Sequence, residues 1–419
     1  GADGSYKICA KLSDLALNPN AYGQSSAFVL KTTGPSFTSL ALAGDAADGY
    51  INLADQVVAD NLVAPATGTN FNTATYKVVS NTATCSTETG YGALPTDKSP
   101  ILSSDGNYKV CVKLDDDAGN PSAYGASATI VLKTAQPTFT SLALAGDALD
   151  GYVNAADKLL TNDLAASISG TAYDTATYKL VSNSTPCDGS LTYGAMPKGT
   201  STDFGADGSY KVCAKLSDLA GNPAAYGASN AFVLKTALPT FSFLALAGDA
   251  ADGYMNASDR TQTNPLAGSL SATNYDQATY KLVTNATLCS AASGYGAMPV
   301  GTSSDFGSDG VYKVCVKLTD NANNPPNYGA SGTFIVKTTQ PGFLSLTLAN
   351  DAADGYISGP ERSLTTDLAG SLAGLNYDQA TYALAPLATT CNNSLTYGAM
   401  PKANSTSFGA DGSYKICAK

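Results

Sequence analysis

The sequence contains no histidine and no tryptophan among its 419 residues. Without histidine, the Ser-His and Cys-His arrangements of nucleophilic catalysis cannot be formed. Paired aspartates can do acid–base chemistry, but a catalytic pair copied in every repeat would be unusual. No glycine-rich phosphate-binding motif is present either. We therefore expect that the protein is not an enzyme.

Charged residues are also scarce, at 14% of the chain, and most of them are acidic. The formal net charge of −11 argues against nucleic acid as a partner, because phosphate contacts need clustered Lys and Arg. Only Glu88 and Glu361 are glutamates, and every other acid is Asp. Because Asp favours turns and Glu favours helices, this bias predicts an all-β chain. No apolar run approaches the roughly 20 residues of a membrane-spanning helix.

What the sequence does contain is a repeat with a period of 102 residues. The segment Gly205-Ala-Asp-Gly-Ser-Tyr-Lys-Val-Cys-Ala-Lys-Leu216 recurs in whole or in part, with its tyrosine at Tyr6, Tyr108, Tyr210, Tyr312 and Tyr414. A unit of this length can bury a core of its own. The expected domains are a partial module over 1–34, complete modules over 35–136, 137–238 and 239–340, and a partial module over 341–419.

Short segments of alternating apolar residues predict six or seven strands in module 137–238. The expected strands are 137–145, 164–170, 178–182, 210–216 and 231–235, with weaker ones at 193–197 and 203–204. Turn-forming Gly, Asp and Pro separate them. This pattern predicts an immunoglobulin-like β-sandwich, so the chain is a tandem, beads-on-a-string array of such modules. The short proline-containing linkers between modules predict a semi-rigid connection.

Two motifs resemble a known family. The run Asp-Gly-x-Tyr-x-Val, followed by Asp218-Leu-Ala-Gly-Asn222 and a final short strand, resembles the C-terminal half of bacterial Ig-like repeats in large surface proteins and adhesins. Asp252-Gly-Tyr-Met-Asn256, after the first strand of its module, is similar to the same family. The resemblance covers the whole chain and implies an Ig-like fold at the cell surface, without specifying a ligand. The cysteine pair in each module departs from most members.

Eight of the nine cysteines form pairs whose members lie 26 residues apart. Metal binding by these thiols is disfavoured, because there is no histidine and no C-x-x-C motif. One disulfide in each module is therefore expected, which implies an oxidising compartment, extracellular or at the cell surface. Cys9 is left over, because its partner would lie before the first residue. The pairs are Cys85 with Cys111, Cys187 with Cys213, Cys289 with Cys315, and Cys391 with Cys417.

The alternation along 210–216 predicts which face carries the disulfide. Cys213 shares its face with Lys211 and Lys215, and two lysines indicate solvent. We therefore expect the bridge on the outer face of its sheet, where it staples the third strand to the sixth, rather than between the sheets. Tyr210 opens the sixth strand, and we expect a core residue whose hydroxyl bonds back to the chain.

Each module also repeats a set of oxygen-bearing side chains, the ligand type that Ca²⁺ prefers. The slightly favoured alternative is that these Asp and Asn residues simply cap turns. Their order partly matches an EF-hand loop, but Gly and Ala stand at coordinating positions, so a true EF-hand is not expected. The resemblance to adhesin repeats implies Ca²⁺ at the module junctions. The candidates are Asp45, Asp48, Asn52, Asp55, Asp147, Asp150, Asn154, Asp157, Asp249, Asp252, Asn256, Asp259, Asp351, Asp354 and Glu361, with Asp116, Asp218 and Asp320 in the facing turns.

Both ends of the chain carry part of a module, and residues 409–419 repeat residues 1–11. The favoured interpretation is a window on a longer repetitive protein. The alternative is head-to-tail strand complementation between chains, in which one chain's start finishes another's end. The overlap counts against this alternative, because both ends then carry the sixth strand.

These features favour an extracellular stalk or filament spacer built from disulfide-stapled modules, with no required cofactor. The alternatives are an adhesin whose modules bind a surface protein or glycan directly, and a strand-complemented fibre subunit. Segment 86–90 differs in sequence from its counterpart 188–192, which keeps the adhesin alternative open. The expected partners are neighbouring modules, copies of the same chain and a surface ligand, with no nucleic acid and no membrane span.

Overall fold

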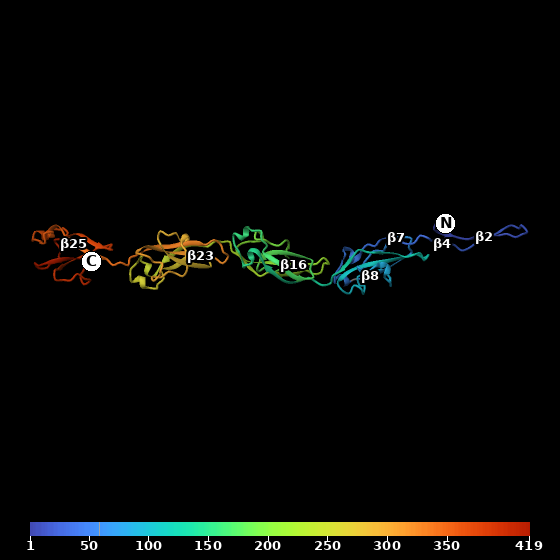
Figure 1. The fold of residues 1–419 in the computed structure, drawn as a ribbon, viewed down its shortest axis with the longest axis horizontal. Coiled ribbons are helices and arrows are strands. Elements are labelled where there is room, and N and C mark those ends of the chain that lie inside the picture. The colour runs from blue at the N-terminus through green and yellow to red at the C-terminus, as the bar shows by residue number, and fades with distance from the viewer. Residues whose placement is uncertain (58) are drawn as a thin grey trace. The chain divides into compact units, whose positions relative to one another are not determined.

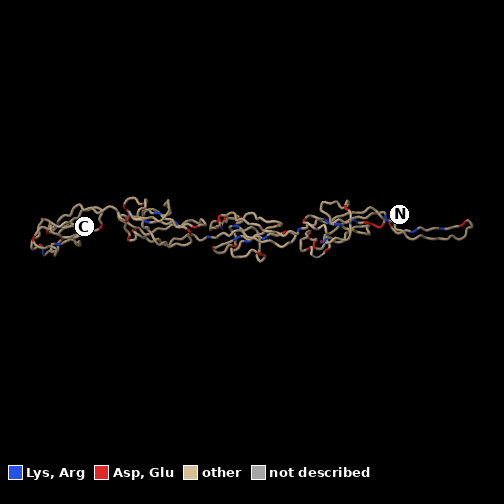
Figure 2. Tube along the Cα trace, turned by 90° about the horizontal axis from the view of Figure 1, so that it is seen from below, with Lys and Arg blue, Asp and Glu red and all other residues tan. Residues whose placement is uncertain are grey.

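The computed structural model describes residues 1–57 and 59–419, and strands dominate it (Figure 1). Two compact units divide the chain, Gly1–Ala237 and Leu238–Lys419. In the part of the chain that is described, no helix is long and apolar enough to cross a membrane. Acidic and basic residues are interspersed along the trace (Figure 2).

Module 137–238 shows the repeated fold. One sheet has the order β13-β18-β16-β15, with β17 also paired to β16, and the other sheet consists of β12 and β14. Strands β15 and β16 are antiparallel neighbours, whereas β13 and β18 run parallel. Two facing sheets with these pairings form an immunoglobulin-like β-sandwich. Its strands are β12 (Thr138–Leu144), β13 (Tyr152–Val153), β14 (Ala165–Thr171), β15 (Thr175–Ser182), β16 (Gly208–Ser217), β17 (Ala225–Ala228) and β18 (Phe232–Leu234).

The same strands recur in module 35–136, whereas in module 239–340 one continuous strand, β24, takes the place of β17 and β18 and also pairs with β19. Module 35–136 contains β5 (Ser36–Ser39), β6 (Tyr50–Ile51), β7 (Thr67–Thr69), β8 (Thr73–Ser80), β9 (Gly106–Asp115), β10 (Ala123–Ala126) and β11 (Ile130–Leu132). Module 239–340 contains β19 (Thr240–Leu246), β20 (Tyr254–Met255), β21 (Ala267–Thr273), β22 (Gln277–Thr284), β23 (Gly310–Thr319) and β24 (Asn327–Val336).

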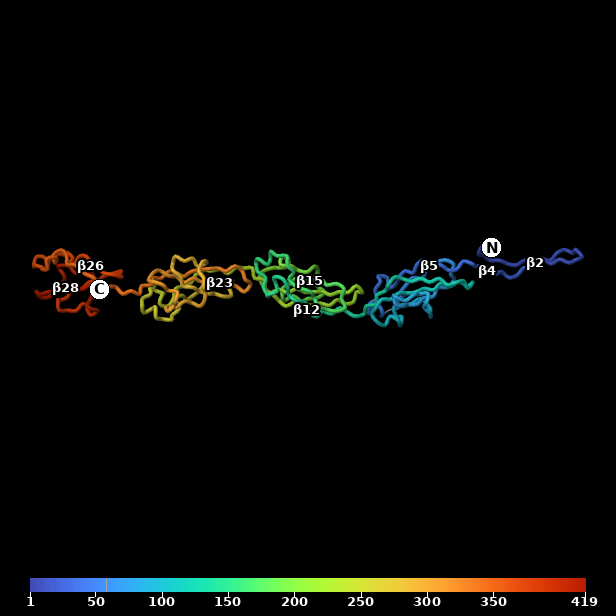
Figure 3. The backbone as a smooth tube through the Cα atoms, viewed as in Figure 1, coloured from blue at the N-terminus to red at the C-terminus, as the bar shows by residue number. Residues whose placement is uncertain are grey.

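Two further segments hold part of this set. Residues 1–34 form β1 (Gly4–Tyr6), β2 (Cys9–Leu12), β3 (Ala21–Gln24) and β4 (Phe28–Leu30), in which β1 pairs with β4 and β2 with β3. Figure 3 shows this segment as an extended, hairpin-shaped trace. Residues 341–419 form β25 (Gly342–Leu348), β26 (Ala369–Leu375), β27 (Tyr382–Pro386) and β28 (Tyr414–Ala418).

Short 3₁₀ turns connect the strands. They are η1 (Gly44–Asp48), η2 (Asp55–Val57), η3 (Cys85–Thr87), η4 (Gly146–Ala148), η5 (Asp157–Leu159), η6 (Gly248–Ala250), η7 (Asp259–Thr261), η8 (Cys289–Ala291), η9 (Asn350–Ala352) and η10 (Glu361–Ser363).

Each complete module has a hydrophobic core of its own. In module 137–238, Leu142 of the two-stranded sheet packs in one cluster with Leu180, Val212 and Phe232 of the larger sheet. Val212 is fully buried and Phe232 is 1% exposed. Burial of such side chains contributes about 1.5–3 kcal/mol each. Alternation therefore places Val212 in the core and the intervening lysines outside, as the sequence predicts.

The observed strands of module 137–238 differ from the expected set in two ways: two expected short strands are absent, and two unexpected strands are present. Segments 193–197 and 203–204 form no strand, and Tyr178 pairs with Gly194 only as an isolated bridge. Strand β17 is unexpected. Gly227 explains how it packs, because a Cβ there would overlap the ring of Phe139 in the facing sheet. Strand β13 is also unexpected, because two residues are too few to show alternation.

The structure joins all four cysteine pairs as disulfides, with the Cα atoms of Cys187 and Cys213 5.4 Å apart. Cys213 lies outside the core cluster of its module, on the outer face of β16. It is nevertheless fully buried, which corrects the expectation that this face is solvent. The reason is visible in module 35–136, where η3, which carries Cys85, packs over β9 and β10. The bridge therefore ties the covering loop, rather than the preceding strand, to the sixth strand.

Tyr210 has the expected corner position at the start of β16. Its hydroxyl donates to the carbonyl of Ala206 at 2.8 Å and accepts from the amide of Gly205 at 2.9 Å. The phenol ring packs in the core beside Phe204 and Phe232. Tyr210 is thus a packing and turn-fixing residue.

Candidate functional site: the linker between modules

The linker that follows β11 is hydrogen-bonded to the module before it. The Lys133 amide donates to the Ile51 carbonyl at 2.9 Å. The Asp105 carboxylate, just before β9, accepts from the Thr134 amide at 2.8 Å and from its hydroxyl at 2.7 Å. The other oxygen of Asp105 accepts from the Ala135 amide at 3.3 Å. Three successive linker residues are therefore fixed to module 35–136.

The module after the linker bonds to Lys133 through both the side-chain ammonium and the backbone carbonyl of this residue. The Lys133 ammonium lies 2.6 Å from Oδ2 of Asp174, in the turn between β14 and β15. The Lys133 carbonyl accepts from Nδ2 of Asn222 at 2.8 Å, in the turn between β16 and β17. Since these two turns belong to module 137–238, the linker is bonded to both modules that it connects.

The Asn222 side chain is itself held in place. Asp218 accepts from the Asn222 amide at 3.0 Å and from its Nδ2 at 2.8 Å. Asn222 is 7% exposed, so these bonds compete little with water. The Leu219 amide also donates to Asp174 at 2.8 Å, which joins the two turns. The result is a preformed polar socket for Lys133.

A direct contact between the two modules lies beside this socket. Nδ2 of Asn52 donates to the carbonyl of Ala220 at 2.7 Å. The Asn52 amide group is oriented, because its Oδ1 accepts from the amides of Ala54 and Asp55. Asn52 belongs to the acidic loop of module 35–136, and Ala220 belongs to the Asp218 turn of the next module. Asn52 of the acidic loop therefore contacts the turn that contains Asp218, whereas the expected facing of Asp45 and Asp48 toward Asp218 stays a prediction.

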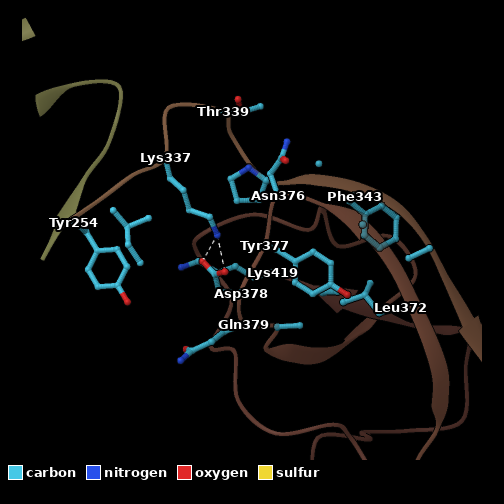
Figure 4. A pocket seen from close by; sticks show the side chains of 17 residues that line it. Tyr254, Lys337, Thr339, Phe343, Leu372, Asn376, Tyr377, Asp378, Gln379 and Lys419 are labelled. Atoms are coloured by element: carbon cyan, nitrogen blue, oxygen red, sulfur yellow. Dashed lines mark hydrogen bonds and ion pairs between the residues drawn. The ribbon is translucent and has the colours of Figure 1, made fainter. Parts of the chain in front are cut away.

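The same linker contacts recur elsewhere within each unit. At the first linker, Asp3 accepts from the Thr32 amide at 2.8 Å, and Nδ2 of Asn120 donates to the Lys31 carbonyl at 3.1 Å. In the second unit, Asp309 accepts from the Thr338 amide at 2.9 Å. Lys337 pairs there with Asp378, the contact drawn with dashed lines in Figure 4.

The linker carboxylates are stabilised in their charged form. Donation from the Lys133 ammonium, with a smaller effect of the Leu219 amide, lowers the pKa of Asp174. Partial burial works to raise the pKa of Asp105, but hydrogen bonds from Thr134 and Ala135 outweigh it, so the pKa is lowered. The Thr32 hydroxyl and amide lower the pKa of Asp3 to about 2. All three groups are thus anionic at neutral pH.

Most of the candidate calcium ligands cap turns, where they accept from nearby backbone amides. Asp48 accepts from the Tyr50 amide at 2.9 Å, and Asp55 accepts from the Asn52 amide at 2.8 Å. In the described residues, no group of three or more acidic or cysteine side chains is arranged to hold a metal ion. The same caps recur at Asp150, Asp157, Asp252, Asp259, Asp354 and Glu361, and the side-chain amide caps at Asp116, Asp218 and Asp320.

Asp45 differs from its counterparts in the other modules. Asp147 accepts from the side-chain amide of Asn162 at 3.0 Å, and Asp249 accepts from Asn264 in the same way. In module 35–136 the asparagine is replaced by Asp60, and burial followed by the charge of Asp60 raises the pKa of Asp45. Asp97 is fully buried beside them, and its Oδ2 is the one buried side-chain oxygen without a hydrogen-bond partner among the described residues.

Comparisons with known proteins bear on the fold. No family model matches the chain, and no curated protein matches its sequence. A structure from a 1.5-MDa bacterial ice-binding adhesin is similar at 20% identity, over 73% of this chain and 98% of that one, with a TM-score of 0.33. A Ca²⁺-stabilized adhesin with which an Antarctic bacterium binds ice is similar at 18% identity, over 86% and 88%, with a TM-score of 0.30. Titin domains A168–A170 are similar at 13% identity, over 73% and 99%, with a TM-score of 0.26.

The residues that fix the linker, Asp105, Lys133, Asp174 and Asn222, are called the linker clamp here. None of them was among the site residues expected from the sequence. Lys133, Asp105 and Asn222 are far apart in the chain, so no local pattern joins them. A signal is nevertheless present, because the linker lysine recurs at every module boundary, at Lys31, Lys133, Lys235 and Lys337. An otherwise exposed lysine that never varies between copies indicates a specific partner.

Proposed function

We propose that the chain is an extracellular structural array of bacterial Ig-like type that serves as a stalk or filament spacer. The observation that carries this proposal is the double attachment of the linker to the modules on either side. Bending at Lys133 would break its bonds to Asp174 and Asn222, and would separate Asn52 from Ala220. A connection with these costs favours one angle between neighbouring modules, which a spacer requires.

The disulfides support the extracellular location. The bridge of each complete module joins a half-buried loop cysteine to a fully buried strand cysteine, and such bridges persist in oxidising compartments. The proposal includes no catalytic role and no required cofactor. Calcium at the junctions stays a prediction, and the backbone caps on Asp48 and Asp55 favour the turn-capping alternative.

Distances across one junction test the spacer proposal in the full chain. In a Cys9→Ser background, spin labels at Lys98→Cys and Leu149→Cys lie on exposed positions of the two modules. Double electron–electron resonance should give a narrow distance distribution. The substitutions Lys133→Ala and Asn52→Ala together should broaden it.

Lys179→Ala provides a matched control, because it breaks a Lys–Asp pair of the same length, 2.6 Å, inside one module. This control should leave the distribution unchanged. Equal distributions for all three proteins, or a broad distribution before any substitution, would contradict the proposal.

One observation favours direct adhesion as a second function. Segment 86–90 and its counterpart 188–192 differ in sequence and lie largely exposed on the outer face, over the disulfide. An exposed loop whose sequence differs between copies of a repeat is a candidate binding surface. Replacing 86–90 with the residues of 188–192 should change binding to a glycan or protein array if this function exists, and should leave the junction distances unchanged.

A further inference from the structure

The outer face of the larger sheet carries a pair of tyrosine rings in every complete module. In module 137–238 the ring centres of Tyr193 and Tyr226 lie 5.8 Å apart. Tyr193 directly follows segment 188–192, and Tyr226 belongs to β17. Both tyrosines are half-buried, so part of each side chain stays open to solvent. The equivalent pairs are Tyr91 with Tyr124, and Tyr295 with Tyr328.

Lys215 lies beside this pair on the same face of the sheet. It is directly opposite Tyr226 in the antiparallel register of β16 and β17, so the two side chains are neighbours. Both are on the outer face, because Gly227, the next residue of β17, faces Phe139, which packs against the core. The same position opposite a tyrosine is held by Lys113 and Lys317.

In module 35–136 an acid neutralises the lysine of this face. Nζ of Lys113 lies 2.9 Å from Oδ2 of Asp115, two residues further along the same strand. The Asp115 carboxylate also accepts from the Ser122 hydroxyl, which holds it in place. Its hydrogen bond raises the pKa of Lys113. The charge of Lys113 is therefore matched within the module.

The other two complete modules lack this acid. Ser217 and Thr319 stand at the position of Asp115. Among the described residues, no carboxylate is paired with Lys215 or Lys317. In a chain whose net charge is −11, these two ammonium groups beside partly open rings are available to an anionic ligand.

We propose that Tyr193, Tyr226 and Lys215 bind an acidic glycan, a polysaccharide whose sugar rings carry carboxylate or sulfate groups. The C–H face of a sugar ring packs on the aromatic pair, and the Lys215 ammonium pairs with the acidic group. This inference rests on direct adhesion, the second function given above, and names the ligand class. The equivalent site of module 239–340 consists of Tyr295, Tyr328 and Lys317.

The position on a sheet face favours a glycan over a peptide or a second copy of this chain. Peptides that add to a sheet need an open strand edge, and amphipathic helices need a groove. The site consists instead of side chains on the face of two strands, β16 and β17, that are already paired with each other. A sugar ring needs neither an edge nor a groove, because it packs on the aromatic rings themselves.

Biolayer interferometry of the full chain tests the site on immobilised polysaccharides. The background is Cys9→Ser, which removes the free thiol. The probes are polygalacturonate, which carries carboxylates, dextran sulfate, which carries sulfates, and dextran, which is neutral. We expect binding to at least one acidic polymer and none to dextran, and the two acidic polymers show which anionic group is preferred.

Ser217→Asp combined with Thr319→Asp places the acid of module 35–136 beside both unpaired lysines. Because module 35–136 carries this acid itself, the circular dichroism should stay unchanged. Binding should weaken about tenfold, which corresponds to the loss of one charge-assisted hydrogen bond. The matched control adds the same charge at exposed positions near the other end of the same strand pairs, and should leave binding unchanged. It combines Ser184→Asp with Ala286→Asp.

Two further variants separate charge from ring stacking. Asp115→Ser frees Lys113 and should strengthen binding of the full chain, because a third site adds to avidity. Tyr226→Leu combined with Tyr328→Leu keeps apolar side chains but removes the flat rings, and should weaken binding about fivefold.

Four results would overturn the proposal: no binding to either acidic polymer, equal weakening by the two pairs of Asp substitutions, full binding after removal of the rings, or self-association of the chain that Ser217→Asp abolishes. Direct adhesion is tested separately by the exchange of segment 86–90. A ligand whose binding follows that exchange but none of these variants would support adhesion and contradict the glycan site.

Discussion

Module 35–136 should become more stable when Asp60 is replaced by asparagine, the residue at the equivalent position of modules 137–238 and 239–340. Asp60 stands where module 137–238 has Asn162, whose side chain donates to Asp147 at 3.0 Å. Asp60→Asn restores this donor toward Asp45 and removes one of three adjacent negative charges. The bond between Asn162 and Asp147 is solvent-exposed, so we expect the gain to lie at the low end for an intramolecular hydrogen bond.

The assay must report on one module, because an array of several domains does not unfold as a single two-state system. Hydrogen exchange of β9, the central strand of module 35–136, provides this report in the full chain. A gain of this size should slow exchange of its most protected amides by a factor of about 2–5. Amides of β16 in the next module serve as an internal reference.

The reverse substitution is the control. Asn162→Asp in module 137–238 recreates the acidic pair there, and should speed exchange of β16 by a similar factor. The pKa of Asp45 is raised, so the folded module binds this proton more tightly than the unfolded chain. Its stability should therefore fall as pH rises from the ordinary value of 3.8 through the raised pKa, and Asp60→Asn should flatten this slope. Unchanged or faster exchange of β9 in Asp60→Asn at pH 7 would refute the reasoning.

Three further predictions follow from the linker and the disulfides. Replacing Cys187 and Cys213 by Ala should destabilise module 137–238 by about 3.5 kcal/mol, since the bridge closes a loop of 26 residues, and hydrogen exchange of β16 measures this. The pKa of Asp174 is lowered, so its bond to Lys133 is complete above about pH 4. The bond is lost as the pH falls below 3.8 and through the lowered pKa. The distribution of spin-label distances across the junction should therefore broaden on acidification. Millimolar Ca²⁺ should leave this distribution and the exchange rates unchanged, whereas a site filled at 100 times its Kd would add about 2.7 kcal/mol.

The fold could be predicted from the sequence wherever a strand is long enough to alternate. Strand β16 shows this, because its lysines and core residues fall on opposite faces over ten residues. Strand β17 could not be predicted, because Ala225–Ala228 contains the glycine that its facing phenylalanine requires, and glycine normally marks a turn. The disulfide pairing followed from constant spacing. Its burial did not, because the covering loop has no regular pattern.

The linker site could not be predicted for a different physical reason. Asn222 reaches a carbonyl 89 residues earlier, and Asn52 reaches one 168 residues later. Both bonds have a backbone carbonyl as acceptor. Because every residue type has this carbonyl, the sequence at the acceptor position gives no sign of the bond. The resemblance to adhesin repeats implied that the acidic loop and the Asp218 turn meet at the junction. It assigned the contact to carboxylates and calcium, whereas the structure uses side-chain amides.

The residues of the linker clamp are divided between two successive modules, so the stiffness of each linker depends on both of the modules that it connects. In module 35–136, Asp105 fixes the linker that follows the module. In module 137–238, Asp174 and Asn222 bind the linker that precedes the module. Neither half has a partner unless another module follows or precedes. The linkers at Lys31, Lys133 and Lys337 share this division, so the same kind of connection recurs within each unit. Lengthening such an array by duplication therefore adds reach without a new interface, and a change at one linker alters only the angle at that linker.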